Sequence, residues 1–420
     1  MRLRFWKARG SWKTRGRRTL IAAALTTTIA AGTTGWAVGN EQQPVTGPPP
    51  GAQAWRADHT WGVRLPDPAA TAPARVAEFF GSLGEEQQHR LARRHPSVVG
   101  NLDGAPTSLR YEANSLSMKA QRAREQARES DPGLTAQDHE QARSLVARYE
   151  ELLSPGRQIL AFDPRGRGQV AEVFGDLSSA KHVSVVVPGS DIDLSTFDRS
   201  NDEYGTPAGM ARSLHAAAGS GTAVVAWVGY TTPVGLGPDA ATGRLAEAGA
   251  PRLARFVRGL SASGAPRPAV FCHSYGSVVC GLAAPQLTAS DLVVLGSPGM
   301  RADSVADLHT SARVWAAKDD SDWIGDVPNV ELFGLGHGED PADPGFGARR
   351  VPAERAEGHT GYFAPGTDSL RAFADIAEQT TVPSAPDNAT ATGTRTRTGA
   401  GTGTGGSASA ADARPIGERP

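Results

Sequence analysis

The sequence predicts an α/β fold that is built on a mostly parallel β-sheet. Short apolar runs recur in the second half of the chain, at residues 183–187, 222–228, 269–272, 292–295, 314–317 and 330–333. These runs are apolar throughout, which is typical of strands that are buried on both faces. Helix-compatible stretches separate several of them, for example residues 240–260 and 278–289, as in parallel strands joined by crossover helices. Functional side chains are therefore expected at the carboxyl ends of the strands.

A helical region, residues 73–155, is predicted before this sheet, and the catalytic domain is expected over residues 156–380. Apolar residues recur at helical spacing near its start, namely Val76, Phe79, Phe80 and Leu83. Ser82 with Glu85, and Thr135 with Asp138, have the spacing of a capping box at a helix amino terminus. These stripes are typical of packing surfaces.

Both ends of the chain differ in composition from its middle. Residues 1–39 hold eight Arg or Lys and no acid, followed by an uncharged apolar run from residue 20 to 38, so we expect a signal peptide or a retained N-terminal anchor. Residues 40–72 are predicted to be a linker, and the Thr-, Gly- and Ser-rich residues 381–420 a disordered tail. Whether residues 1–39 are a signal peptide or a retained anchor, the folded part of the chain is expected to be secreted or in the cell envelope.

Net charge and histidine spacing argue against two classes of function. Beyond residue 39 the chain has 35 basic and 44 acidic residues, a net charge near −9, which argues against nucleic acid as a partner. The ten histidines lack the paired spacing of metal ligands, so neither a metal site nor a cofactor is predicted.

Ser274 is the predicted nucleophile. It directly follows the apolar run 269–272 and precedes a helix-compatible stretch, so it lies on a strand-to-helix turn. Such a turn points the hydroxyl into the cleft and places it at a helix amino terminus, which favours developing negative charge. Gly276 supplies the close approach that the turn needs. This arrangement predicts a serine hydrolase of the α/β-hydrolase type; the alternative is an ordinary turn at a strand end.

The two cysteines of the chain flank this turn. Cys272 stands where the usual motif, G-x-S-x-G, has glycine. Cys280 lies in the second turn of the following helix, so the two side chains are within reach of each other across the turn. A disulfide is one interpretation, and two buried thiols are the other.

The acid and the histidine are expected in the chain order serine, acid, histidine. Asp319, Asp320 and Asp322 follow the run 314–317, and Asp322 is preferred because apolar residues come directly after it. His337 and His359 both lie in Gly-flanked loops after the acid, and either could serve as the histidine. His359 is chosen, with His337 in reserve. The predicted triad is therefore Ser274, Asp322 and His359.

Backbone amides are expected to form the oxyanion hole. One should be the amide of Tyr275, directly after the nucleophile. The second should come from the loop after an early strand, where Ser190 and Asp191 follow a Pro-Gly pair.

Several segments resemble an actinobacterial α/β-hydrolase family of otherwise undefined function, over about residues 75–380. The resemblance is carried, in order, by residues 102–106 with Arg110 and Asn114, residues 187–189, 273–277 and 322–324, His337-Gly338 with residues 346–348, and Gly358-His359 followed by Tyr362. It implies the α/β-hydrolase fold with an amino-terminal helical region, and the triad Ser274, Asp322 and His359. Cys272 departs from the glycine that is common in the family.

The reaction predicted from these residues is cleavage of a carboxylic ester through an acyl-enzyme on Ser274. The expected substrate is a small-molecule or lipid ester, with membrane contact only if the N-terminal segment is retained. The same residues also suit an amidase or an acyltransferase acting on envelope components. A non-catalytic envelope-binding module is the alternative from a different class.

Overall fold

The computed structural model describes residues 41–380, except residues 61, 63 and 333. The predicted signal peptide or anchor and the predicted tail lie outside the described residues. The described residues belong to one compact unit.

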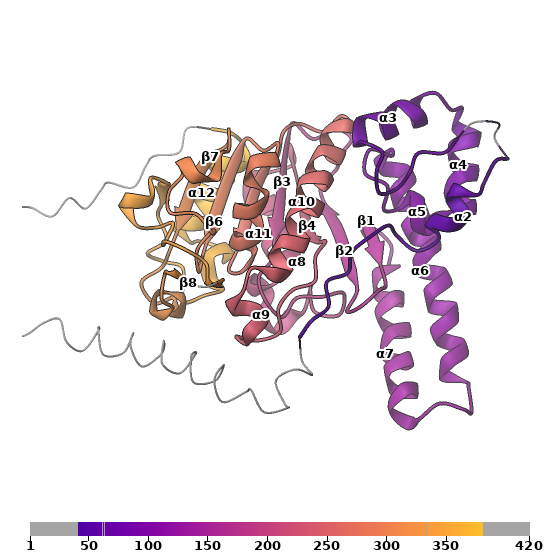
Figure 1. The fold of residues 1–420 in the computed structure, drawn as a ribbon, viewed down its shortest axis with the longest axis horizontal. Coiled ribbons are helices and arrows are strands. Elements are labelled where there is room, and N and C mark those ends of the chain that lie inside the picture. The colour runs from indigo at the N-terminus through magenta and orange to yellow at the C-terminus, as the bar shows by residue number, and fades with distance from the viewer. Residues whose placement is uncertain (1–40, 61, 63, 333, 381–420) are drawn as a thin grey trace, which may run out of the picture. The chain divides into compact units, whose positions relative to one another are not determined.

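The centre of the fold is an eight-stranded sheet in the order β1-β2-β4-β3-β5-β6-β7-β10 (Figure 1). Its strands are β1 (Gln158–Asp163), β2 (Gln169–Phe174), β3 (His182–Val187), β4 (Thr222–Val228), β5 (Ala269–His273), β6 (Asp291–Leu295), β7 (Arg313–Ala317) and β10 (Arg349–Val351). β1 and β2 are antiparallel to their neighbours, and the six strands from β4 to β10 in this order are parallel. Together with the covering helices, this strand order is that of the α/β-hydrolase fold, which confirms the predicted fold class.

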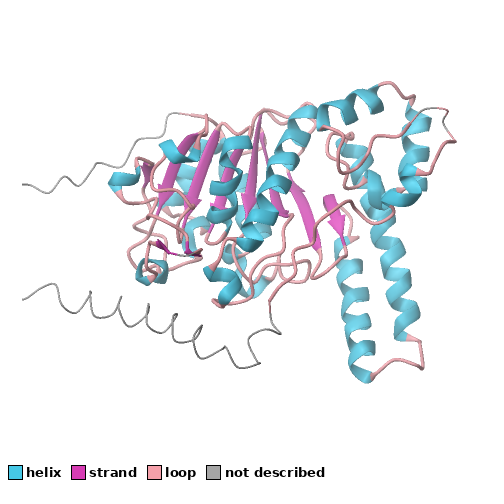
Figure 2. Ribbon diagram, viewed as in Figure 1, coloured by secondary structure: helices cyan, strands magenta, loops and turns pink. Residues whose placement is uncertain are grey.

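Alternate residues of the strands from β1 to β7 enter two different hydrophobic clusters, so both faces of the sheet are covered (Figure 2). On β5, for example, Val270 and Cys272 belong to one cluster and Ala269 and Phe271 to the other. Helices α10 (Arg244–Ala262) and α11 (Gly276–Ala283) contribute to the first cluster. Helices α8 (Pro207–Ala218) and α12 (Asp368–Ala377) contribute to the second.

The amino-terminal region is helical, as predicted. Its helices are α2 (Ala52–Arg56), α3 (Pro73–Gly81), α4 (Glu85–Arg94), α5 (Pro96–Val99), α6 (Thr107–Glu129) and α7 (Ala136–Leu152). Thr135 and Asp138 form the predicted capping box of α7. The box predicted at Ser82 is wrong: the N-cap of α4 is Gly84, which is bonded by Gln87, and the Ser82 hydroxyl donates back to the Phe79 carbonyl.

Residues predicted to be a linker fold onto the rest of the unit. Trp55 of α2 is completely buried, and its indole N–H donates to the Pro66 carbonyl at 2.7 Å. Further upstream, the Val45 amide donates to Thr231 Oγ1 at 3.0 Å, in the loop after β4.

One predicted strand was wrong. Residues 330–333 do not join the main sheet, because β8 (Glu331–Leu332) pairs with β9 (Leu335–Gly336) in a separate two-stranded sheet. β10 takes the edge position beside β7 instead. The short helix α9 (Pro238–Ala241) and six 3₁₀ turns complete the described elements. Over the part of the chain that is described, no helix has the length and apolarity needed to cross a lipid bilayer.

Candidate active site

Ser274 lies on a sharp turn between β5 and α11. Its φ of 54° is in the left-handed region, which is strained for a residue with a side chain. The turn is held by the Ser274 amide, which donates to the Leu295 carbonyl at 3.0 Å, and by the Ser277 hydroxyl, which donates to the Cys272 carbonyl at 3.1 Å. A strained strand-to-helix turn that holds a serine is the geometry of a nucleophile elbow.

Two glycines allow the backbone to pack against this elbow. A Cβ on Gly189, in the loop after β3, would lie 2.6 Å from the Ser274 Cβ and 3.0 Å from its Oγ. A Cβ on Gly276 would lie 2.7 Å from the carbonyl oxygens of Val187 and Pro188. Both positions need glycine because the loop after β3 touches the nucleophile turn directly.

A disulfide joins Cys272 to Cys280, with the Cα atoms 6.5 Å apart. Both cysteines are completely buried in the cluster that lies under α10 and α11. The bond therefore ties β5 to α11 directly beneath Ser274. Position 272, where the usual motif has glycine, can carry a side chain here because its sulfur is bonded to Cys280.

The structure pairs His359 with Asp322. The ring Nδ1 of His359 lies 2.9 Å from Asp322 Oδ1, and the Asp322 side chain is fully buried. Asp322 follows β7, and His359 lies in the loop between β10 and α12, so the pair meets at the carboxyl edge of the sheet. Trp323 lies beside the His359 ring, with 4.5 Å between ring centroids.

The buried Asp322 carboxylate has three donors in all. Besides His359, the Ile324 amide donates to Oδ1 at 2.9 Å and the Tyr362 hydroxyl to Oδ2 at 2.6 Å. Burial alone raises the pKa of Asp322, but these hydrogen bonds and the nearby imidazole outweigh it and hold the pKa below its ordinary value. An ionised, fixed carboxylate is what orients an imidazole for proton transfer.

His273, the residue before the nucleophile, links the elbow to the histidine loop. Its Nε2 donates to the His359 carbonyl at 2.7 Å, and the two rings lie 4.7 Å apart. Burial, and next the neighbouring His359, lower the pKa of His273 to about 3. His273 is therefore neutral near neutral pH, and its N–H stays committed to the His359 backbone.

The Ser274 hydroxyl makes no hydrogen bond to other described residues, the His359 ring included. Catalytic hydrogen bonds of this kind often close only when substrate is present. The contact between His273 and His359 nonetheless places the histidine loop directly against the nucleophile turn.

The three predicted oxyanion donors differ in whether their backbone amides already have an acceptor. Tyr275 caps α11, where amides have no acceptor within the helix. Ser190 follows Gly189, which touches Ser274, and no acceptor for its amide occurs among the described residues. Asp191 was wrong as a donor, because its amide already donates to the Pro233 carbonyl at 2.8 Å.

Of the reserve candidates, His337 lies apart from the His359–Asp322 pair, whereas Asp319 lies beside it, because the Asp319 amide donates to the Tyr362 hydroxyl at 3.1 Å. His337 is buried against the Tyr275 ring, and its Nε2 donates to the Ala240 carbonyl at 2.7 Å. Burial lowers the pKa of His337 to about 4. The Asp319 carboxylate accepts from the amide and hydroxyl of Ser321, and Asp320 is exposed.

Two residues of this site were not predicted as functional. The contacts of His273 and Tyr362 depend on segments that are far apart in the sequence, 86 residues for His273 and 40 for Tyr362. The signal available for Tyr362 was its place three residues after His359. Within the part of the chain that is described, no group of three or more His, Cys, Asp or Glu residues is arranged to hold a metal ion.

Comparisons with known proteins identify a family model and several similar chains. A family model described as alpha/beta hydrolase matches residues 163–332, the stretch from the end of β1 to β8. Two uncharacterized proteins of Mycobacterium tuberculosis, from strains CDC 1551 and H37Rv, are each 32% identical over 373 residues, which cover 75% of this chain. The match spans 57% of each relative's own length. A solved structure of a predicted CIB-like hydrolase from Thermoplasma acidophilum is 14% identical and covers 53% of this chain and 99% of its own, with a TM-score of 0.35. Strand order and family match together place this chain among the α/β hydrolases by fold, with uncharacterized mycobacterial relatives.

Proposed function

We propose that this protein is a serine hydrolase that cleaves a carboxylic ester through an acyl-enzyme on Ser274. The observation that carries the proposal is the strained Ser274 at the β5–α11 turn, tied by His273 to the loop of the buried His359–Asp322 pair. Neither a structural turn nor a binding module requires a strained serine beside a hydrogen-bonded acid and imidazole.

In this reaction the Ser274 oxygen attacks the ester carbonyl while His359 Nε2 takes the hydroxyl proton. The amides of Tyr275 and Ser190 stabilise the oxyanion, and Asp322 stabilises the imidazolium that forms. The tetrahedral intermediate collapses as His359 returns the proton to the leaving alcohol. Water then attacks the acyl-enzyme by the same steps, which releases the acid and restores Ser274.

The substrate is proposed to be a small-molecule or lipid ester outside the cytoplasm. The Cys272–Cys280 disulfide supports an oxidising compartment, because such bonds persist there and are rare in the cytosol. An amide bond, or acyl transfer to an envelope component, would use the same residues, and the structure favours neither over ester hydrolysis.

The test is labelling of the full-length protein by a fluorophosphonate probe, which reacts with activated serines. We expect the wild type to be labelled and Ser274→Ala not to be. Ser195→Ala is the control, since this serine is exposed in the loop after β3 and, among the described residues, only its backbone amide is bonded, to Asp193. An unlabelled wild type, or labelling that survives Ser274→Ala, overturns the proposal.

A further inference from the structure

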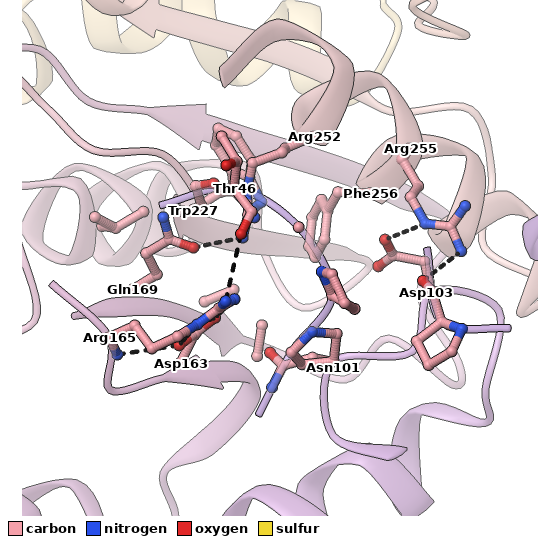
Figure 3. A pocket seen from close by; sticks show the side chains of 18 of the residues that line it. Thr46, Asn101, Asp103, Asp163, Arg165, Gln169, Trp227, Arg252, Arg255 and Phe256 are labelled. Carbon is pink, nitrogen blue, oxygen red and sulfur yellow. Dashed lines mark hydrogen bonds and ion pairs between the residues drawn. The ribbon is translucent and has the colours of Figure 1, made fainter. Parts of the chain in front are cut away.

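A cavity lies away from Ser274, between the sheet edge and the amino-terminal region. Its volume is about 390 Å³, and none of Ser274, Asp322 and His359 lines it. β1, β2 and β4 supply one wall and α10 another, while residues 46–49 and the loop at residues 101–103 complete it (Figure 3). Cavities of roughly 300–1,000 Å³ are the size that holds small molecules.

Positive charge exceeds negative charge in this cavity. Its charged lining residues are four arginines and two aspartates, which leaves an excess of two positive charges: Arg110, Arg165, Arg252, Arg255, Asp103 and Asp163. Arg165 forms an ion pair of 2.6 Å with Asp163. Arg110 and Arg255 share the single carboxylate of Asp103, at 3.3 and 3.5 Å.

Of the four arginines that line the cavity, Arg252 is the one that forms no ion pair with a carboxylate of the described residues. Within the described residues its guanidinium donates only to neutral oxygens: the Gly229 carbonyl at 2.6 Å, the Val45 carbonyl at 3.4 Å and Gln169 Oε1. Burial lowers the pKa of Arg252, since it disfavours the charged form. A largely desolvated guanidinium without a directly paired carboxylate is costly unless an anion completes the site, even though Asp163 and Asp103 lie near enough to favour its charged form.

The same cavity also has a donor without an acceptor. The Gln169 side chain accepts from Arg252 through Oε1, and its Nε2 is buried with no partner. Figure 3 shows Gln169, Arg252 and Arg165 grouped on one side of the space. This side therefore presents donors and positive charge, and it is complementary to a group made of acceptor oxygens.

The remaining wall is aromatic. Trp227 and Phe256 line the cavity, and their rings lie 6.0 Å apart. Trp227 stacks on Tyr230, and Tyr230 stacks on Tyr275 beside the nucleophile, so two aromatic contacts separate the cavity from the elbow. Aromatic walls suit a flat apolar body next to the charged group.

From these contacts we propose that the cavity binds a small organic oxyanion, a carboxylate or a phosphate monoester with a planar apolar body. The oxyanion accepts from Arg252 and Gln169 Nε2, and the apolar body lies against Trp227 and Phe256. Guanidinium groups bind both kinds of oxyanion through paired N–H donors. The site is independent of the proposed ester hydrolysis and does not require it.

The test is calorimetric titration of the full-length protein with benzoate, with phenyl phosphate and with benzyl alcohol as the neutral analogue. We expect one site per chain for at least one anion and none for the alcohol. Arg252→Gln should weaken that binding about tenfold or more, because a charge-assisted contact is lost. Arg258→Gln, on the same helix but bonded to the Gln286 carbonyl outside the cavity, should leave it unchanged. The anion that binds more tightly identifies the ligand class.

A second variant covers the case that Arg252→Gln does not fold. Ala248 lines the cavity four residues before Arg252, and Ala248→Trp fills the space without removing a hydrogen bond. It too should abolish binding, whereas Ser274→Ala should not. Absence of binding to the wild type, equal binding of benzyl alcohol, full binding by the cavity variants, or loss of binding in Ser274→Ala overturns the proposal.

Discussion

Two regions of this molecule bury charged side chains, and they do so in opposite ways. At the candidate active site the Asp322 carboxylate receives three donors, so its charge is compensated by the protein itself. In the cavity under α10, Arg252 bonds only neutral oxygens, and positive charge remains in excess. The first region is a closed network that fixes its groups in advance, and the second is an open site that a ligand would complete. This difference agrees with the two proposals, in which the first region catalyses a reaction and the second binds a ligand.

The largest effect on kcat is expected from a substitution of Asp322, the carboxylate at the centre of the closed hydrogen-bond network. Asp322→Asn removes the charge that orients and stabilises His359, and we expect kcat for an ester substrate to fall by about 10⁴-fold. Asp319→Asn is the control, because Asp319 is buried nearby but its carboxylate bonds only Ser321. Equal losses in the two variants would show that His359 is not paired functionally with Asp322.

The next effect tests the link between the elbow and the histidine loop. His273→Phe removes the bond to the His359 carbonyl, and we expect kcat to fall by roughly 10²-fold, as for a misplaced catalytic group, with KM little changed. His273→Gln keeps an N–H donor near the Nε2 position and should recover most of the rate. Since the pKa of His273 is about 3, the acid limb of the pH–rate profile should keep its position in both variants. A profile that shifts would mean that His273 titrates in the working range.

A smaller effect is expected from removing one donor of the network. Tyr362→Phe leaves Asp322 Oδ2 buried without its hydroxyl partner, which should cost about 1–3 kcal/mol of unfolding free energy. Folding lowers the pKa of Asp322, so its stabilisation is complete above the unfolded value of 3.8 and is lost as the pH falls through the folded value. Denaturant unfolding should therefore separate the two proteins most at neutral pH, and the gap should narrow in acid to the part that comes from the Asp319 amide, which loses the Tyr362 hydroxyl as its acceptor at every pH. A gap that is constant with pH would contradict this origin.

The smallest effect is expected in the open region. Arg252→Met removes a desolvated cation, which stabilises the fold, and also its three hydrogen bonds, which destabilises it, so without ligand the unfolding free energy should change by less than about 1 kcal/mol. The same denaturant titration measures it beside Tyr362→Phe. A loss as large as that of Tyr362→Phe would show that Arg252 is part of a closed structural network as well.

The central strands could be predicted because they are apolar on both faces. β3, β4, β5, β6 and β7 begin and end within one residue of the predicted runs. β10 was missed because Arg349 and Arg350 are exposed at the sheet edge and leave no apolar run. The run at 330–333 looks like a strand, yet Val330 is 57% exposed and the segment lies outside the main sheet.

The candidate site was predictable where chain order carries the information. Ser274 follows from a strand-to-helix turn. Chain order restricts the acid to Asp319, Asp320 or Asp322 and the histidine to His337 or His359, and the structure pairs Asp322 with His359. Asp191 could not be judged from the sequence, because its amide is occupied by a carbonyl 42 residues away, that of Pro233. The excess positive charge around Arg252 could not be predicted from the sequence either, because the residues that line this cavity come from six separate parts of the chain.

The His359 loop has a consequence for protein engineering. His359 and Tyr362 reach the two oxygens of one carboxylate, and His273 bonds the main chain at residue 359 and no side chain there. The loop is therefore sensitive to its length more than to its composition. Substitutions at Glu357 or Thr360 should be tolerated, whereas a single insertion between residues 359 and 362 would pull one of the two donors out of register. Loop grafting from related chains should therefore preserve this spacing first and side-chain identity second.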